Sequence, residues 1–377
     1  MTKIIGIICE YNPLHNGHIY HINKIKEMFP DSIIILVTNG YFSQRGEINI
    51  LNKLDKINSS LNHNIDLIVE LPFVFATQSA DIFASGAIQI LNTLNIDTLV
   101  FGSEINNIET LKKIATIQDS TKYNNLLKEF LDKGINYPTA ISKAISKLTN
   151  KNINTPNDLL GISYIKAIKH LNSNIEAISI KRTNDYHSLN SDNRIISGTA
   201  IRNLIKENKN INDFVPKDIF DLNLKYIDLN NYFDLLKYKI LCEKENINKY
   251  QTVDEGIENR ILKYISKCNN TDDLISVIKT KRYTYNKICR MFIHILCSFT
   301  KEEANRNKKI EYIRILGFNN NGQKYLNKIK KNVSIPIISK LGKQEFEQLL
   351  IEKRVTDIYN LKSNIIINEY KEIPIRK

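Results

Sequence analysis

The chain has 377 residues, 42% of them hydrophobic and 25% charged, which is the composition of a globular protein with room for two or three domains. No run of 18 apolar residues occurs, and no basic leader precedes the first apolar segment. We therefore expect no membrane span, no signal peptide and a cytoplasmic location. The five cysteines are odd in number and lack C-x-x-C spacing, which argues against a disulfide framework and against a zinc site.

The net charge of +13 is concentrated in one segment of the chain. Residues 279–343 contain 16 Lys and Arg against three acids, so the rest of the chain is neutral. Such a field favours a phosphate-rich macromolecular partner, a nucleic acid. Four aromatic residues of this segment are candidates to stack on unpaired bases: Tyr283, Tyr285, Phe292 and Tyr312. The alternative is a solvated basic helix face with its aromatic side chains in the core.

The first 104 residues alternate short apolar runs with helical patterns. Strands are predicted at 3–9, 32–38, 66–70 and 98–101, and helices at 16–28, 52–63 and 79–92. This alternation predicts an α/β fold with a doubly wound parallel sheet. In such sheets ligands bind beyond the carboxyl ends of the strands. The loops that fall at this edge are 10–18, 39–47, 70–81 and 102–104.

The later part of the chain adds helices and one more strand. Residues 105–150 are predicted to form a helical insertion, and a further helix opens near Asn157, with Thr155 or Asn157 as its cap. A fifth strand is predicted at 176–180, before a helix that starts near Ser197. Beyond Pro216 the pattern is helical to about residue 300. We therefore expect an α/β domain over residues 1–215 and a mostly helical, basic domain over 216–377.

The most informative motif is His15-Asn16-Gly17-His18, which follows an apolar strand and opens a helix. The free N–H groups and the positive dipole end of a helix start favour a phosphate. Gly17 has no side chain to hold a phosphate away. The two histidines can donate hydrogen bonds to oxygens that gain charge when a phosphoryl group is attacked. The alternative assigns them to a helix cap and to the surface.

A second predicted helix start carries groups suited to the β- and γ-phosphates of a nucleoside triphosphate. Ser197 and Thr199 offer hydroxyls, and Arg202 offers a guanidinium about one turn inside the helix. His-x-Gly-His after the first strand, combined with this second helix start, resembles the HxGH nucleotidyltransferase superfamily. Members of that superfamily attack the α-phosphate of ATP and release pyrophosphate.

Further motifs narrow the resemblance. In their order along the chain they are similar to those of the bacterial tRNA(Met) cytidine acetate ligases. They are Glu10-Tyr11-Asn12-Pro13, Gly40-Tyr41-Phe42-Ser43-Gln44-Arg45-Gly46-Glu47, Glu70-Leu71-Pro72, Ala80-Asp81, Phe101-Gly102-Ser103-Glu104, Asn157-Asp158, Tyr164, Lys181-Arg182, Tyr186-His187 and Lys281-Arg282-Tyr283-Thr284.

The resemblance implies an ATP-dependent ligase with a nucleotidyltransferase-like catalytic domain over 1–215 and a tRNA-binding domain over 216–377. Acetate would attack the α-phosphate of ATP to give acetyl-adenylate. The N4 amine of the wobble cytidine of elongator tRNA(Met) would then take the acetyl group, leaving N4-acetylcytidine and AMP. Magnesium is expected mainly on the phosphates, with no dedicated metal site in the protein.

The resemblance also assigns roles to residues. The catalytic residues would be His15 and His18, which stabilise the α-phosphate, and Arg202, which holds the leaving pyrophosphate. The ATP-binding positions would be Ile7, Ile8, Cys9, Glu10, Tyr11, Asn12, Pro13, Leu14, His15, Asn16, Gly17, His18, Ile19, Tyr20, Gly102, Asn157, Arg182, Ser197 and Thr199.

Several alternatives stay open from the residues alone. Gly102 can be a turn residue, Asn157 a helix cap and Arg182 a surface charge. Arg45 is a candidate for the acetate carboxylate or for a phosphate. The alternative function is a small-molecule adenylyltransferase that acts on nicotinamide mononucleotide or pantetheine phosphate. An RNA-binding protein with a degenerate nucleotide site is a third possibility.

Overall fold

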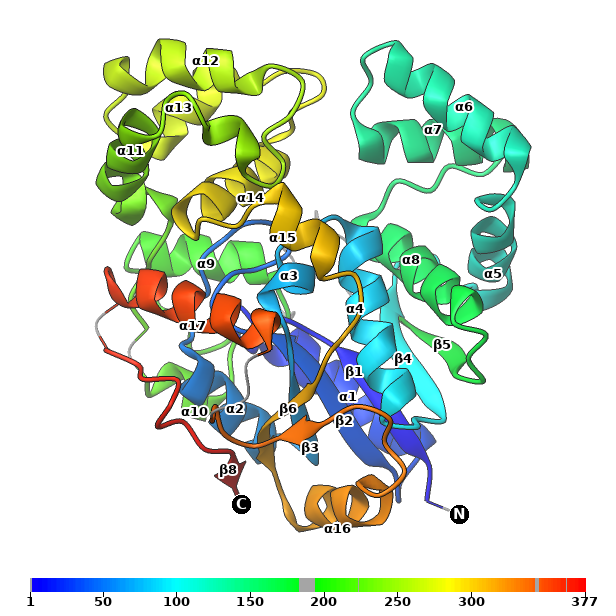
Figure 1. Cartoon of the computed structure of the whole chain (residues 1–377). Helices are drawn as coiled ribbons and strands as arrows, with labels where there is room; N and C mark the ends of the chain where they lie inside the picture. Colours follow the sequence, from blue (N-terminus) through cyan, green and yellow to red (C-terminus); the bar gives the residue numbers. More distant parts are fainter. Residues whose placement is uncertain (1, 183–193, 223, 343–345, 364) are drawn as a thin grey trace.

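The computed structural model describes residues 2–182, 194–222, 224–342, 346–363 and 365–377. Within these residues a central sheet has the strand order β5-β4-β1-β2-β3-β6-β7, and β8 pairs with β6 (Figure 1). Five strands are parallel: β1 (Ile4–Ile8), β2 (Ile33–Asn39), β3 (Leu67–Leu71), β4 (Thr98–Ser103) and β5 (Glu176–Lys181). The α/β, mostly parallel fold expected from the sequence is confirmed.

Helices cover both faces of the sheet because successive strand residues point to opposite sides. Ile34 and Leu36 of β2 pack in one apolar cluster, whereas Ile35 and Val37 pack in the other. The first face is covered by α1 (Asn16–Met28), α2 (Lys53–Asn62) and α9 (Gly198–Lys206). The second is covered by α4 (Ala80–Thr93) and α8 (Pro156–His170), with the short α3 (Phe73–Ala76) ahead of α4.

The elements predicted for the first 200 residues lie where the sequence indicated, with ends that differ by a few residues. The helical insertion consists of α5 (Ile108–Ile117), α6 (Thr121–Asp132) and α7 (Tyr137–Thr149). Helix α5 packs on α8, and α6 and α7 form a hairpin. Figure 1 shows this hairpin standing above the carboxyl ends of the parallel strands.

The chain after residue 216 is helical at first. It forms α10 (Lys217–Phe220), α11 (Phe233–Cys242), α12 (Ile257–Tyr264), α13 (Thr271–Ile278), α14 (Tyr285–Leu296) and α15 (Lys301–Arg306). Helices α11 to α14 face the α6–α7 hairpin across the top of the molecule, whereas α10 lies beside α2 (Figure 1).

The chain then returns to the sheet, which the sequence pattern did not predict. Strand β6 (Ile313–Phe318) pairs antiparallel with β3, and β7 (Ile337–Ile338) and β8 (Ile375–Arg376) pair with β6. Helix α16 (Asn320–Ile329) lies at the amino end of β3, where Asn319 N donates to Asp66 O at 3.0 Å. Helix α17 (Glu347–Asn360) packs on α3. The segment after residue 300 therefore completes the edge of the N-terminal sheet.

A buried ion cluster joins this returning segment to the sheet. Lys53 Nζ lies 2.6 Å from Glu70 Oε1 and 2.7 Å from Glu369 Oε1, and Arg314 Nη1 lies 3.0 Å from Glu70 Oε2. Arg314 Nη2 also contacts Glu369, and all four side chains are at most 3% exposed. Burial by itself would raise the pKa of Glu369, but Lys53 and Arg314 hold that pKa well below its ordinary value.

The contribution of the cluster to stability is tested by replacing one member, because this leaves the remaining buried charges without a partner. We expect Glu369→Gln to lower the free energy of unfolding by about 3–5 kcal/mol, because the amide cannot neutralise Arg314 and Lys53. Urea unfolding at neutral pH measures this loss. The control is Glu372→Gln, a half-buried glutamate of the same segment outside the cluster. Equal losses in the two variants would contradict the assignment.

Candidate active site

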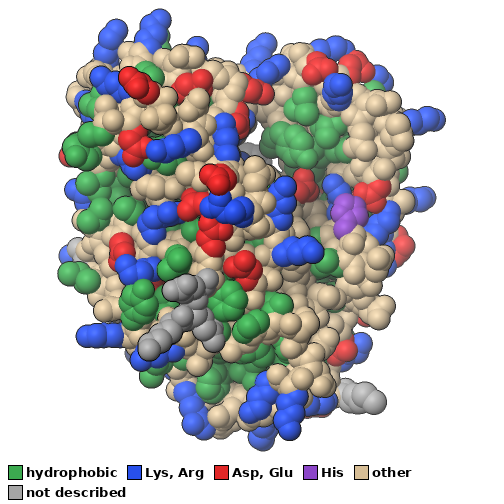
Figure 2. All heavy atoms as spheres, in the orientation of Figure 1, with side chains coloured by type: hydrophobic (Ala, Val, Ile, Leu, Met, Phe, Trp, Pro, Cys, Tyr) green, Lys and Arg blue, Asp and Glu red, His purple; other side chains and the backbone are tan. Residues whose placement is uncertain are grey.

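The candidate site is a cavity of about 1280 Å³ beyond the carboxyl ends of the parallel strands. The four predicted loops 10–18, 39–47, 70–81 and 102–104 all contribute to its wall, the last through Gly102 near the end of β4. The α6–α7 hairpin lines one side, and residues around the start of α14 line the other. Figure 2 shows the surface hollowed between these two parts of the molecule.

The start of α1 is built by its own histidines. His15 is the N-cap, and its Nδ1 accepts a hydrogen bond from Gly17 N at 3.0 Å. His18 Nδ1 accepts from His15 N at 3.3 Å, which completes a capping box. The centroids of the two rings lie 3.8 Å apart, and Tyr11 meets His18 edge-on at 4.7 Å. The cap is therefore a structural role that coexists with the predicted catalytic one.

These contacts fix the chemistry of both rings. Because each Nδ1 accepts a backbone N–H, a neutral ring carries its proton on Nε2. Burial, with Arg182 and Arg202 nearby, lowers the pKa of His15 to about 3. Burial and the neighbouring His15 lower the pKa of His18 well below its ordinary value. Both histidines are thus neutral at physiological pH and present an Nε2–H donor.

Gly17 is required by the ring beside it. A Cβ atom at this position would lie 2.9 Å from His15 Cε1, 3.0 Å from His15 Nδ1 and 3.3 Å from Ile195 Cγ2. The glycine therefore allows the His15 ring to fold back over the first turn. The sequence argument, which concerned the approach of a phosphate, missed this packing reason.

The start of α9 faces the start of α1. Ser197 is the N-cap and its hydroxyl accepts from Ala200 N at 3.2 Å. A Cβ on Gly198 would lie 3.7 Å from His15 Cδ2, so the two helix starts are in contact range. Two positive dipole ends and their free N–H groups therefore point to one region, a suitable place for several phosphates.

Arg202 is held in place by oxygen atoms from three segments. Its Nη1 donates to Asn12 O at 2.9 Å, and its Nη2 donates to Glu47 Oε1 at 2.8 Å and to Thr199 Oγ1 at 3.1 Å. The side chain is 13% exposed. The structure thus brings Arg202, Thr199 and the loop after β1 together, as expected from the sequence.

A third group of predicted residues lies at the ends of β4 and β5. Arg182 Cγ would lie 3.2 Å from a Cβ on Gly102, so the arginine covers this glycine. Arg182 Nε is 3.6 Å from Glu104 Oε1, and Asn157 Nδ2 donates to the same oxygen. Thr155, not Asn157, occupies the N-cap of α8. Asn157 therefore lies in the cavity wall with its amide held by Glu104.

Most of the predicted ATP-binding positions line the cavity, and five do not. The lining positions are Ile8, Cys9, Glu10, Tyr11, Asn12, His15, Gly17, His18, Tyr20, Gly102, Asn157, Arg182, Ser197 and Thr199, together with Arg202. The five outside the wall are Ile7, Pro13, Leu14, Asn16 and Ile19.

Three of the five have other structural roles. Ile7 and Leu14 are fully buried in the core. The Asn16 amide donates to Arg194 O and Asp213 O, both at 2.9 Å, and so holds the segments before and after α9. The motif residues Tyr186 and His187 lie outside the described residues.

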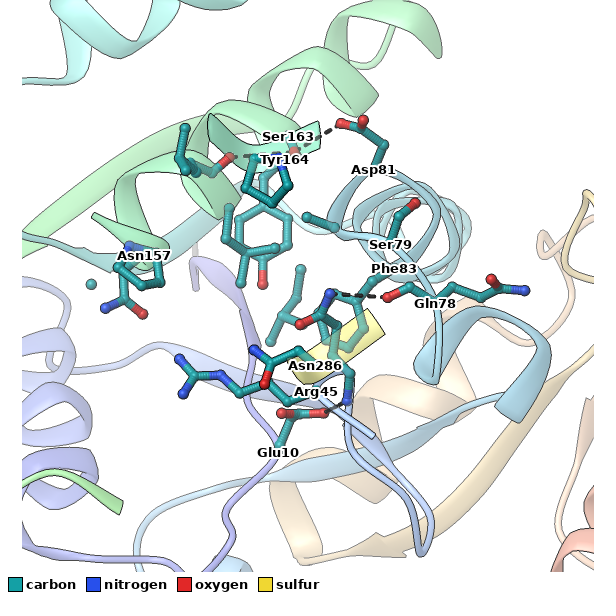
Figure 3. A pocket seen from close by; sticks show the side chains of 18 of the residues that line it. Glu10, Arg45, Gln78, Ser79, Asp81, Phe83, Asn157, Ser163, Tyr164 and Asn286 are labelled. Carbon is teal, nitrogen blue, oxygen red and sulfur yellow. Dashed lines mark hydrogen bonds between the residues drawn. The ribbon is translucent and has the colours of Figure 1, made fainter. Parts of the chain in front are cut away.

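Sequence reasoning gave no role to several side chains of the wall. Figure 3 shows Gln78, Phe83, Tyr164 and Asn286 around the space that Glu10 and Arg45 also face. Gln78 and Phe83 belong to the segment after β3, and Tyr164 belongs to a motif of the resemblance, so the sequence already placed all three near the active edge. Asn286 comes from α14, and nothing in the sequence placed it there.

Helix α14 reaches the cavity by packing on the loop after β2. Gly46 has φ of +78°, and a Cβ there would lie 2.3 Å from Arg290 N. Arg290 Nη1 donates to Gln44 O at 3.1 Å. Glycine is needed here both for the left-handed backbone and for the close approach. The loop and α14 therefore form one wall of the cavity.

The basic segment does not form one surface, which corrects a premise of the sequence analysis. Arg282, Lys287 and Arg290 line the cavity, but Arg314 is buried in the ion cluster. The lysines of α16 lie at the amino end of the strands, away from the cavity (Figure 1). Tyr283, Phe292 and Tyr312 are core residues at 3% exposure or less, whereas Tyr285 is 47% exposed. Of the four aromatics, Tyr285 alone is accessible to a base.

The described ranges contain no helix that is long and apolar enough to cross a membrane. They also contain no group of three or more His, Cys, Asp or Glu side chains arranged to hold a metal ion.

The family of the chain follows from its similarity to known proteins. Residues 2–372 match the family described as HIGH Nucleotidyl Transferase, so the chain is a nucleotidyltransferase-fold protein. The tRNA(Met) cytidine acetate ligases of Clostridium acetobutylicum and Clostridium novyi are each 38% identical to it, over 95% and 99% of both chains. The chain belongs to the tRNA(Met) cytidine acetate ligase family.

Solved structures agree with this placement. The apo crystal structure of Thermotoga maritima TmcAL matches with a TM-score of 0.91 at 30% identity, covering 100% of this chain and 99% of that one. The same relative bound with alpha-thio ATP matches with a TM-score of 0.89 over the same shares.

The packing of His15 on Gly17 predicts the effect of one methyl group. Gly17→Ala would push the His15 ring off the first turn, and we expect the Kd for ATP to rise about 10- to 100-fold, the cost of a lost hydrogen bond to a charged group. Isothermal titration calorimetry measures the Kd for ATP. Gly342→Ala is the control, because a Cβ there meets nothing within 4 Å. Wild-type affinity in Gly17→Ala would refute the role given to the capping ring.

Proposed function

We propose that the chain is an ATP-dependent ligase that activates acetate as acetyl-adenylate and transfers the acetyl group to N4 of the wobble cytidine of elongator tRNA(Met). The observation that carries this proposal is the cavity itself. It presents two helix starts and two Nε2–H donors at one end and opens between the α6–α7 hairpin and α14 at the other. At about 1280 Å³ it exceeds the roughly 300–1,000 Å³ of an ordinary small-ligand pocket.

In the first step an acetate oxygen attacks the α-phosphorus of ATP in line with the departing pyrophosphate. Neutral His15 and His18 donate from Nε2 to the α-phosphate oxygens as negative charge grows on them. Ser197, Thr199 and the start of α9, with Arg202, hold the leaving pyrophosphate. The step needs no covalent bond to the enzyme.

Other groups around the reacting atoms have supporting roles. Gly102, Asn157 and Arg182 form the wall next to the nucleoside end of ATP. Arg45, which faces the cavity and has no ion-pair partner among the described residues, is positioned to bind the acetate carboxylate. Mg²⁺ would arrive on the phosphates of ATP and neutralise part of their charge.

The tRNA would approach through the open end of the cavity. Arg282 spans this opening, since its Nη1 lies 3.4 Å from Glu255 Oε1 on one side and its Nη2 donates to Leu131 O at 3.4 Å on the other. Lys287 lines the same opening. The sequence predicts catalysis by residues 1–215 and tRNA binding by residues 216–377. In this proposal the part of the second range that contacts tRNA is residues 251–290. Such a reaction belongs in the cytoplasm, where tRNA and ATP are present.

One assay tests the proposal directly. The protein is incubated with ATP, radiolabelled acetate and bulk tRNA, and the RNA is digested to nucleosides. We expect the label in N4-acetylcytidine and one AMP released per acetyl group. Absence of label from RNA, with adenylylation of nicotinamide mononucleotide or pantetheine phosphate instead, would show a small-molecule adenylyltransferase.

The route of the tRNA predicts a difference between two charge reversals. Arg282→Glu at the cavity opening should weaken tRNA binding at least tenfold at low salt, because it replaces a phosphate-binding cation by an anion. Lys324→Glu makes the same charge change on α16 and should have a much smaller effect. Filter binding at several salt concentrations measures both. An equal loss in Lys324→Glu would place the tRNA elsewhere on the protein.

A further inference from the structure

If the proposed function holds, the transfer of the acetyl group to cytidine needs a general base, and the inference about that base rests on the proposed function. The cytidine N4 amine is part of an aromatic system that withdraws its lone pair, so it is a weak nucleophile. When it attacks the acetyl carbonyl, the new N–C bond places positive charge on the nitrogen. A group in the cavity must accept the proton.

His21 lines the cavity too, but burial lowers its pKa to about 4, so its ring is a weak base. The two histidines of the helix start cannot act as the base either. Both Nδ1 atoms already accept backbone N–H groups, at 3.0 Å for His15 and 3.3 Å for His18. Both Nε2 atoms already carry a proton, and burial lowers both pKa values. A ring in this state donates hydrogen bonds and has no free lone pair to accept a proton.

Most other acidic groups of the wall are also engaged. Glu47 pairs with Arg202 at 2.8 Å, and Glu255 pairs with Arg282 at 3.4 Å. Asp81 accepts from Ser163 Oγ at 2.9 Å and from the Tyr137 hydroxyl at 3.0 Å. Asp132 is exposed at the end of α6, on the hairpin. Glu47 and Glu255 are thus paired with arginines, Asp81 also has Lys166 Nζ at 3.9 Å from its Oδ1, and Asp132 is exposed to solvent.

Cys9 and Tyr164 are excluded for a different reason. Both line the cavity, but burial raises the pKa of the Cys9 thiol to about 12 and that of the Tyr164 hydroxyl well above its ordinary value. Both remain protonated at physiological pH. Neither is able to accept a proton from a weakly basic amine.

Glu10 is the carboxylate that remains. It lies two residues beyond the end of β1, in the loop that leads to the N-cap His15 and to α1. One of its oxygens, Oε1, accepts from Gln44 N at 2.6 Å, and its other oxygen has no hydrogen-bond partner among the described residues. No described cation forms an ion pair with it. Figure 3 shows Glu10 beside Arg45 in the cavity that Phe83 and Tyr164 also line.

We propose that Glu10 is the general base of acetyl transfer. The N4 lone pair attacks the carbonyl carbon of acetyl-adenylate, and Glu10 takes the proton that nitrogen loses. The bond from the carbonyl carbon to the phosphate oxygen then breaks, and AMP leaves with its electron pair. Glu10 later releases the proton to solvent. The products are N4-acetylcytidine, AMP and one proton, so atoms and charge balance.

The surroundings of Glu10 suit this role. Burial raises its pKa, while Gln44 N and the charges of Lys56 and Arg45 partly offset the rise, and Glu47 adds to it. A carboxylate with a raised pKa is a stronger base, and the optimal pKa of a general base lies near the working pH. Lys56 comes from α2, and Arg45 and Glu47 come from the loop after β2.

The test compares two acceptors of the same adenylate. Hydroxylamine is a strong nucleophile that needs no base, so it reports how much acetyl-adenylate is formed, whereas tRNA reports transfer. Glu10→Gln keeps an oxygen that can accept from Gln44 N but removes the base. We expect its ratio of acetylcytidine to acetohydroxamate to fall about 100-fold or more against wild type. The ratio corrects for any loss of adenylate formation.

Three results separate the possibilities. If wild type makes acetohydroxamate but no acetylcytidine, the proposed function has failed, whatever Glu10 does. If wild type makes both and Glu10→Gln loses both in proportion, Glu10 has a structural role and the inference is overturned. If the variant makes no adenylate, single-turnover transfer from supplied acetyl-adenylate is compared between Glu10→Gln and wild type. A wild-type rate of acetylcytidine formation in the variant would overturn the inference.

Discussion

The site depends on one interaction, the hydrogen bonds by which His15 and His18 cap the helix that they begin. A free helix start offers N–H groups to any anion, but here one of these groups binds His15 Nδ1, and the N–H of the cap residue itself binds His18 Nδ1. The cap thereby chooses the tautomer of each ring and aims a proton outward from Nε2. The same hydrogen bonds stabilise the helix start and select the tautomer. A change that removes one of these bonds would therefore affect both the helix start and the Nε2–H donor. Burial first, and then the positive charge of Arg182, lowers the pKa of both histidines and keeps the pair neutral beside a polyanionic substrate.

The rest of the molecule closes a cavity over this helix start. The sheet supplies four loops, but the walls come from segments that are distant in sequence: the α6–α7 hairpin on one side and α14 on the other. Gly46 lets the loop after β2 lie against the backbone of Arg290, and that contact brings Asn286 and Lys287 to the same space. In the proposed reaction, acid activation and acyl transfer would share this one enclosure, so that a reactive mixed anhydride would pass from one step to the next without leaving for bulk water.

The sequence predicted the elements that have a clear period and failed where burial comes from distant partners. Strands β1 to β4 are short apolar runs between amphipathic helices, so their positions and the active edge followed from pattern alone. Strand β6 was not predicted because Arg314 and Gly317 interrupt its apolar pattern. Arg314 is buried in the core because it forms ion pairs with Glu70 and Glu369, which lie far away in the sequence. The basic segment was wrongly expected to form one charged surface for the same reason. A count of charges along the chain does not show which of them form ion pairs in the interior. Asn286 and Arg290 reach the cavity by a long-range contact, for which no local signal exists.

The buried ion cluster has a consequence for how the protein is made. Lys53 and Glu369 are 316 positions apart, yet they share one hydrogen bond in the interior. During synthesis the first five strands emerge long before Arg314 and Glu369, so the nascent sheet has an open edge at β3, with Lys53 and Glu70 still hydrated. The N-terminal part is therefore not a finished folding unit when it leaves the ribosome. A chaperone that binds exposed strand edges would find its target in that interval, and a message truncated before codon 369 would yield a product that proteases recognise.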